Sequence, residues 1–178
     1  MPRYAAFLRG INVGGHRVKG ADLCPPLEAL GLAPVRTFRA SGNVFFEASP
    51  GEAHEKEISA ALEAALGYEV LTFLRTEKEL RAIAGHEPFG KARTKGSNGK
   101  LQVSMLPTRA SPKARATVMA LATDADLLAF GSRELFWLPR GGTQESDLDL
   151  KAIDAAIGPS TMRTMGTLQQ MLAKFFDG

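Results

Sequence analysis

The sequence predicts an α+β protein made of two ferredoxin-like units, each with a mainly antiparallel four-stranded sheet and helices on one face. Short β-rich and helix-periodic segments follow one another in the order β-α-β-β-α-β, and this order occurs twice. The 178 residues are 44% hydrophobic and 23% charged, as in ordinary globular domains. One unit alone would bury a small core, so we expect the two to pack as one compact protein.

The first unit is expected over residues 1–75. A strand over 3–9 leads into a loop rich in glycine and basic residues that reaches Gly20. Apolar spacing then predicts a helix that ends at Gly31, with Pro25 and Pro26 confined to its first turn and with one apolar face formed by Leu23, Leu27 and Leu30. A hairpin of strands over 35–40 and 43–47 turns at Ser41-Gly42.

A second helix of this unit carries Ile58, Leu62 and Leu66 at helical spacing and ends at Gly67, and a strand over 69–74 follows. Residues 76–99 are expected to form a connection. A helix capped by Thr76 and Glu79 ends near Gly85, and a flexible basic loop covers 90–99.

The second unit is expected over residues 100–178. It begins with a strand over 100–106 and a helix that starts at Ser111-Pro112. A hairpin joins strands over 127–130 and 134–138. A helix over 147–157 with Ser146 and Asp149 as caps, an extended piece over 161–163 and a C-terminal helix complete it. We find no residue-level repeat between the units, so the duplication is one of pattern.

Basic residues gather in two acid-free segments, although the net charge is only +3. The first 21 residues contain no acid, and neither do residues 88–123, which hold Lys91, Arg93, Lys95, Lys100, Arg109, Lys113 and Arg115. A basic face attracts anionic ligands. Solvated loops account for the same pattern, because charged side chains are mostly exposed.

The sequence contains no pattern typical of a metal or cofactor site. The three histidines, His16, His54 and His86, are far apart, and there is no HxxxH, CxxC, GxSxG, Walker A or GxGxxG pattern. We therefore expect no metal and no cofactor, and no catalytic residue can be named. The single cysteine, Cys24, favours a structural role in a reducing cytoplasm. No apolar run is long enough for a membrane helix.

Two polar glycine loops form the candidate site. In a β-α-β-β-α-β sheet the first and third strands are central and antiparallel, so the end of the first lies beside the start of the third. This brings the loop that follows Arg9 next to the turn before Asn43. Backbone N–H groups of glycine-rich loops and basic side chains can together bind an anion. The candidate ligand-binding residues of these two loops are Arg9, Asn12, Gly14, Gly15, Lys19, Arg39, Ser41, Gly42 and Asn43. An ordinary βα connection and a plain hairpin turn explain the same residues.

A third polar cluster covers 140–146, followed downstream by Arg163. Ser146 is predicted to cap the helix that follows. Arg163 precedes the last helix, where it could pair with an acid or face an anion, so it is included among the candidate ligand-binding residues.

The motifs "LRGINVGG" and "RASGNVFFE" resemble bacterial domain-of-unknown-function family 1697, and the similarity extends over nearly the whole chain through "LEALGL", "EPFG" and "LQVSMLP". The resemblance implies a soluble cytosolic protein without an assigned role. Two segments depart from the family pattern. Residues 163–167 replace an Arg-Asn-Trp-Asn-Thr pattern and keep only the arginine and the last threonine, and Asp147 follows Ser146 where the family tends to have lysine.

Three functions remain open at this point. The first is binding of a small anion, such as a nucleotide or phosphorylated metabolite, between the two loops. The second is a protein-interaction or self-associating module. The third is RNA or single-stranded DNA binding on a sheet face, with Phe7, Phe45 and Phe46 as candidate stacking residues, although core packing explains these better.

Overall fold

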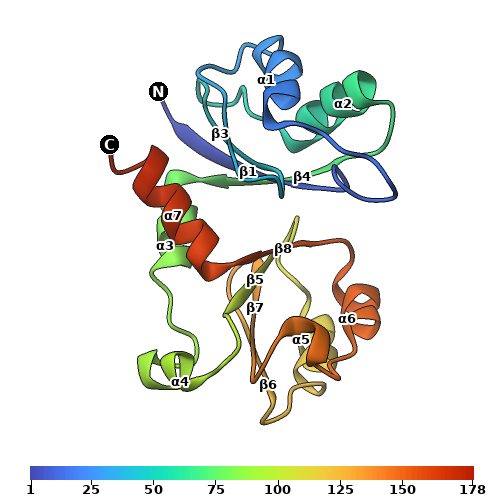
Figure 1. Cartoon of the computed structure of the whole chain (residues 1–178), viewed down its shortest axis with the longest axis vertical. Coiled ribbons are helices and arrows are strands. Elements are labelled where there is room, and N and C mark those ends of the chain that lie inside the picture. The colour runs from blue at the N-terminus through green and yellow to red at the C-terminus, as the bar shows by residue number, and fades with distance from the viewer. The chain divides into compact units, whose positions relative to one another are not determined.

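The computed structural model describes all residues from 1 to 178 and contains two four-stranded antiparallel sheets, each with its own helices (Figure 1). The chain forms two compact units. The first unit comprises residues 1–81 together with 171–178, and the second comprises 82–170. The predicted α+β class, with β-α-β-β-α-β order in both halves, is confirmed.

The first sheet has the strand order β2-β3-β1-β4, with β1 (Arg3–Arg9) and β3 (Asn43–Glu47) in the centre. The edge strands are β2 (Arg36–Phe38) and β4 (Leu71–Thr76). All neighbouring strands are antiparallel. This order follows from the connections, because a crossover helix separates β1 from β2 while a tight hairpin joins β2 to β3.

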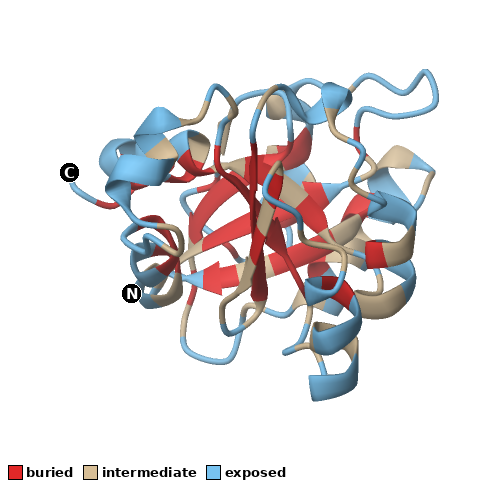
Figure 2. Ribbon diagram, turned by 90° about the horizontal axis from the view of Figure 1, so that it is seen from below, coloured by how far each residue is buried: buried red, intermediate tan, exposed pale blue.

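Two helices, α1 (Gly20–Glu28) and α2 (Glu55–Leu66), lie side by side on one face of the first sheet (Figure 1). Alternate strand residues point to them, and the buried residues are concentrated in the strands (Figure 2). The core between sheet and helices includes Ala6, Leu8, Leu23, Leu27, Val44, Phe46, Ile58 and Leu62.

The opposite face of the first sheet is covered in part by the end of the chain. Phe45 stacks on Phe175 with ring centroids 5.3 Å apart, and it meets Phe176 edge-on at 5.1 Å. Phe7 and Phe45 are buried on this face, and Phe46 is buried among the helices. All three aromatic side chains that could have stacked on nucleic acid bases are therefore core residues.

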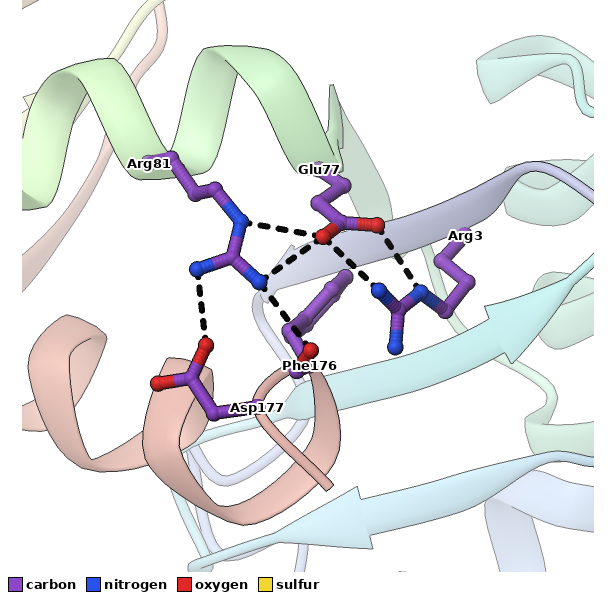
Figure 3. A network of polar contacts seen from close by, with 5 residues as sticks. All are labelled: Arg3, Glu77, Arg81, Phe176 and Asp177. Atoms are coloured by element: carbon purple, nitrogen blue, oxygen red, sulfur yellow. Dashed lines mark hydrogen bonds and ion pairs between the residues drawn. The ribbon is translucent and has the colours of Figure 1, made fainter.

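An ion-pair network holds the chain end in the first unit (Figure 3). Glu77 accepts two hydrogen bonds from Arg3, both 2.8 Å long, and a further one from Arg81. Arg81 also binds Asp177 at 2.7 Å and the carbonyl of Phe176 at 3.0 Å. The network thus joins the start of β1, the helix α3 (Glu77–Ala84) and the C-terminal residues.

The second sheet repeats the topology with the order β6-β7-β5-β8. Its strands are β5 (Gln102–Met105), β6 (Asp126–Phe130), β7 (Glu134–Pro139) and β8 (Thr161–Thr164). The helices α5 (Pro112–Met119) and α6 (Leu150–Ile157) pack on one face over a core that contains Trp137. The chain changes unit within α3 and again within α7 (Met165–Phe175).

Three local predictions are corrected by the structure. The first helix begins at Gly20, so Pro25 and Pro26 lie inside it, and Leu30 is exposed beyond its end. The prolines remove two backbone hydrogen bonds, and burial of two leucines anchors the helix instead. The basic loop predicted over 90–99 contains a short helix, α4 (Lys91–Gly96). The sequence did not indicate this helix because it has only six residues and no apolar periodicity.

The third correction concerns the cap of α6. Asp149 caps this helix by accepting a hydrogen bond from the Ala152 N–H at 2.9 Å, and the helix starts at Leu150 rather than at 147. Ser146 instead donates to the Asp126 carboxylate at 2.6 Å, which also accepts from Trp137 Nε1 at 2.8 Å. The partly buried Ser146 is therefore hydrogen-bonded to the buried pair of Asp126 and Trp137.

The two units share a residue-level feature, contrary to the expectation of a duplication in pattern alone. The last strand of each ends in an arginine followed by a threonine, as Arg75-Thr76 and Arg163-Thr164. Both arginines are buried, and each donates from Nη1 to the carbonyl of the preceding residue at 2.8 Å.

Each of these threonines then caps the helix that follows. The Thr76 hydroxyl accepts from the Glu79 N–H at 3.3 Å, and the Thr164 hydroxyl accepts from the Thr167 N–H at 3.2 Å. In α3 the Glu79 carboxylate also accepts from the Thr76 N–H at 2.8 Å, which completes the predicted capping box. The duplication therefore extends from the strand order to the side chains that end each sheet.

Candidate functional site

The end of β1 lies beside the start of β3, as the topology required. Phe7 pairs with Asn43 in the register, and the Leu8 N–H donates to the Gly42 carbonyl at 2.8 Å. This pairing brings the loop over 10–19 to the turn over 39–42. The two predicted loops are therefore neighbours within the first unit.

Asn12 joins the two loops through its side chain. Its Nδ2 donates to the Ala40 carbonyl, and its Oδ1 accepts from the Val18 N–H at 2.9 Å. The amide thus closes the glycine loop on itself and holds it to the turn. An asparagine can do both at once because its side chain carries a donor and an acceptor.

The turn itself requires unusual backbone angles. Gly42 has φ +81°, and a Cβ added there would lie 2.8 Å from Ile11 Cδ1 and 3.0 Å from Leu8 Cβ. Arg39 also has a positive φ, of 62°. Glycine at 42 is therefore needed both for the backbone conformation and for the close approach of β1.

Asn43 is buried and holds the turn together. Its Nδ2 donates to the Phe38 carbonyl and to the Ser41 hydroxyl, both at 2.9 Å. Both amide hydrogens are thus used within the hairpin. Asn43 shapes the turn from beneath, while Ser41 and Arg39 are exposed.

A cavity of about 410 Å³ lies between the two loops, and we call it the notch. Its lining comes from both loops and consists of Asn12, Gly15, His16, Arg17, Val18 and Ala40. Asn12 and Gly15 were predicted as site residues from the sequence, and the other four were not. Three of those four, His16, Arg17 and Val18, lie between the predicted residues Gly15 and Lys19. Their position within the same loop could have identified them as site residues.

One wall of the notch rests on an aromatic pair. The His16 ring stacks on Tyr68 with centroids 4.0 Å apart, and the Tyr68 hydroxyl donates to the Ile11 carbonyl at 2.8 Å. Burial raises the pKa of Tyr68, so its hydroxyl stays protonated as a donor. Tyr68 thereby ties the glycine loop to the segment after α2.

The charge around the notch is positive. Arg9, Arg17, Lys19 and Arg39 are all exposed, and neither Arg17 nor Lys19 forms an ion pair. Gly14 and Gly15 both have positive φ, and the His16 N–H closes the turn by donating to the Val13 carbonyl at 3.1 Å. Arg17 and Lys19 therefore carry positive charges that no ion pair neutralises.

Arg163 belongs to the second unit, where it is buried in β8. It donates to the Thr161 hydroxyl at 2.7 Å and to the Met162 carbonyl at 2.8 Å. Burial lowers the pKa of Arg163 to about 10, so the guanidinium remains charged at neutral pH.

Cys24 has the environment of a structural cysteine. Its Sγ lies 3.8 Å from the carbonyl oxygens of Gly20 and Val35. Burial raises the pKa of the thiol, and the nearby Glu28 carboxylate raises it further. A protonated thiol is a poor nucleophile, so this site does not resemble that of a catalytic cysteine.

The chain is similar to a solved structure described as that of the conserved bacterial protein SP0830 from Streptococcus pneumoniae. The TM-score is 0.71 and the identity 25%, over 98% of this chain and 99% of the other. Among curated proteins nothing matches. None of the helices combines the length and apolar character that a membrane span needs. A family model described as "Protein of unknown function (DUF1697)" matches residues 1–136, and the chain belongs to this family.

Proposed function

We propose that the protein binds a small anionic ligand, a nucleotide or a phosphorylated metabolite, in the notch between the 10–19 loop and the 39–42 turn. The observation that carries this proposal is the cavity of about 410 Å³ lined by residues of both loops. Its volume lies within the range of roughly 300–1,000 Å³ that is common for small-molecule sites.

The basic side chains around the notch supply the charge that such a ligand needs. A guanidinium can donate two parallel hydrogen bonds to a phosphate or carboxylate, which makes arginine well suited to this task. Arg17 lines the cavity and forms no ion pair, so it can turn to a ligand without breaking a contact.

Nucleic-acid binding on a sheet face has less support. Base stacking on the first sheet would need Phe7, Phe45 or Phe46, and all three are buried. A cytoplasmic location fits the single cysteine, because reduced thiols are typical of that compartment.

The test is isothermal titration calorimetry with ADP and, separately, inorganic pyrophosphate. We expect saturable binding of at least one of the two, weakened by about tenfold or more in Arg17→Gln, since a charge-assisted hydrogen bond contributes about 1.5–3 kcal/mol. Arg9→Gln should weaken binding in the same direction.

The matched control is Arg36→Gln, which removes the same charge from an exposed position on β2 of the same unit, away from the notch lining. Its affinity should equal that of the unmodified protein. Equal losses of affinity in Arg17→Gln and Arg36→Gln would show that binding depends on the net charge of the protein and not on the notch. Absence of binding to both ADP and pyrophosphate would refute the proposal.

A further inference from the structure

A second cavity, of about 260 Å³, lies in the second unit, and we call it the α4 hollow. Its lining comes from the end of α4, from the start of β6 and from the end of β7. The residues are Arg93, Gly96, Ser97, Asp124, Ala125, Leu127, Leu138 and Arg140. Neither the family nor the proposed function assigns a role to these residues.

The backbone around the α4 hollow is locked in place by direct contacts. The Ser97 hydroxyl donates to the Pro139 carbonyl at 2.7 Å, and the Gly99 N–H donates to the Ser97 hydroxyl at 3.1 Å. A Cβ on Gly99 would collide with the Pro139 and Gly141 carbonyl oxygens. The segment after α4 therefore approaches the end of β7 more closely than any other residue type allows.

A backbone hydrogen bond also connects the two strands that line the α4 hollow. The Arg140 N–H donates to the Ala125 carbonyl at 2.8 Å, so the end of β7 is tied to the start of β6. Arg93 and Arg140 thus project from two elements that hydrogen bonds hold together. The backbone segments that carry these two exposed arginines are therefore held close to one another.

The charges in the α4 hollow are not paired with one another. Arg93, Arg140 and Asp124 line the same cavity, yet none of the three takes part in an ion pair. Two guanidinium groups and one carboxylate leave one net positive charge. Such a site favours a ligand with a single anionic group and a donor for Asp124, and it disfavours polyphosphates.

The remaining lining is apolar. Leu127 lies in β6 and is half-buried, and Leu138 lies in β7 and is buried. Apolar surface beside a few placed charges is typical of small-ligand sites.

We propose that the α4 hollow binds a small amphipathic anion. One phosphate or carboxylate group lies between Arg93 and Arg140, a short apolar part packs on Leu127 and Leu138, and a hydroxyl or amine donates to Asp124. The site is independent of the notch, since all its residues belong to the second unit.

The test is a titration with phenyl phosphate, followed through the methyl NMR signals of Leu127 and Leu138 in the full-length protein. We expect saturable shifts of both leucines. The double variant Arg93→Gln/Arg140→Gln should weaken binding by about a hundredfold, because it removes two charge-assisted hydrogen bonds that each contribute about tenfold. Inorganic phosphate, which lacks the apolar part, should bind more weakly than phenyl phosphate.

Two controls separate this site from other effects. Lys95→Gln/Lys100→Gln removes the same number of positive charges from residues 88–123, the acid-free segment that contains Arg93, without changing a lining residue, and it should bind as the unmodified protein does. Arg17→Gln should also leave the leucine shifts unchanged, so this proposal can fail or stand independently of the notch. Unsaturable or absent shifts, or equal losses in the two double variants, would overturn it.

Discussion

Gly42→Ala tests the contact that creates the notch. The variant places an alanine at φ +81°, which costs about 1–2 kcal/mol for an L-residue. Its Cβ also lies 2.8 Å from Ile11 Cδ1 and 3.0 Å from Leu8 Cβ, and overpacking of this kind costs about 1–3 kcal/mol. We therefore expect the free energy of unfolding to fall by about 2–5 kcal/mol.

Gly51→Ala provides the matched comparison. Gly51 has φ +84°, but a Cβ added there meets nothing within 4 Å, so only the backbone term of about 1–2 kcal/mol applies. The difference between the two variants isolates the clash with β1 and the glycine loop. It should amount to about 1–3 kcal/mol.

The assay is urea-induced unfolding followed by far-UV circular dichroism, with Trp137 fluorescence recorded in parallel. The only tryptophan lies in the second unit, so its signal separates a loss in the first unit from general destabilisation. Equal losses for Gly42→Ala and Gly51→Ala would refute the argument that the close approach of the two loops restricts position 42.

Three further predictions concern other parts of the chain. Burial opposes ionisation of Glu77, but hydrogen bonds from its two arginine partners lower its pKa. The ionised carboxylate therefore stabilises the folded state fully above about pH 4.3, the ordinary pKa of glutamate. This contribution to the free energy of unfolding is lost as the pH falls through the lowered pKa of Glu77. Glu77→Gln should therefore cost about 1 kcal/mol at neutral pH and remove part of the acid sensitivity seen in urea titrations, whereas the exposed Glu57→Gln should not. Phe175→Ala should cost about 3–5 kcal/mol in thermal and urea unfolding, because it empties the place of a buried ring, and a loss below 1 kcal/mol would contradict that packing. Gly99→Ala should lower the urea midpoint of Trp137 fluorescence, whereas Gly96→Ala, which has open space around it, should leave the midpoint unchanged or raise it.

Much of the fold was predictable because local and long-range signals agree. The strand over 3–9 and the hairpin around Ser41-Gly42 combine β-rich composition with glycine at the turn, and both are confirmed. The adjacency of Arg9 and Ser41 then followed from strand order alone. The start of α1 was misjudged because burial of Leu23 and Leu27 outweighs the penalty of two prolines, and no sequence rule weighs these against each other.

Side-chain partners were harder to predict than elements. Asn43 was expected near a ligand, but it is buried and donates within the hairpin. Ser146 was expected to cap a helix, but it reaches Asp126, which is distant in sequence. The hydrogen-bond partner of a side chain depends on which groups the fold brings within hydrogen-bonding distance, and spacing along the sequence does not contain that information.

The inclusion of residues 171–178 in the first unit has a consequence for synthesis. The four strands of the first sheet are available once residue 76 has been made, yet the rings that cover Phe45 come from positions 175 and 176. Every residue of the second unit must leave the ribosome before these rings do. The first unit is thus the earlier of the two to start and the later to be completed, and a chain that stops short of residue 175 leaves an aromatic surface uncovered.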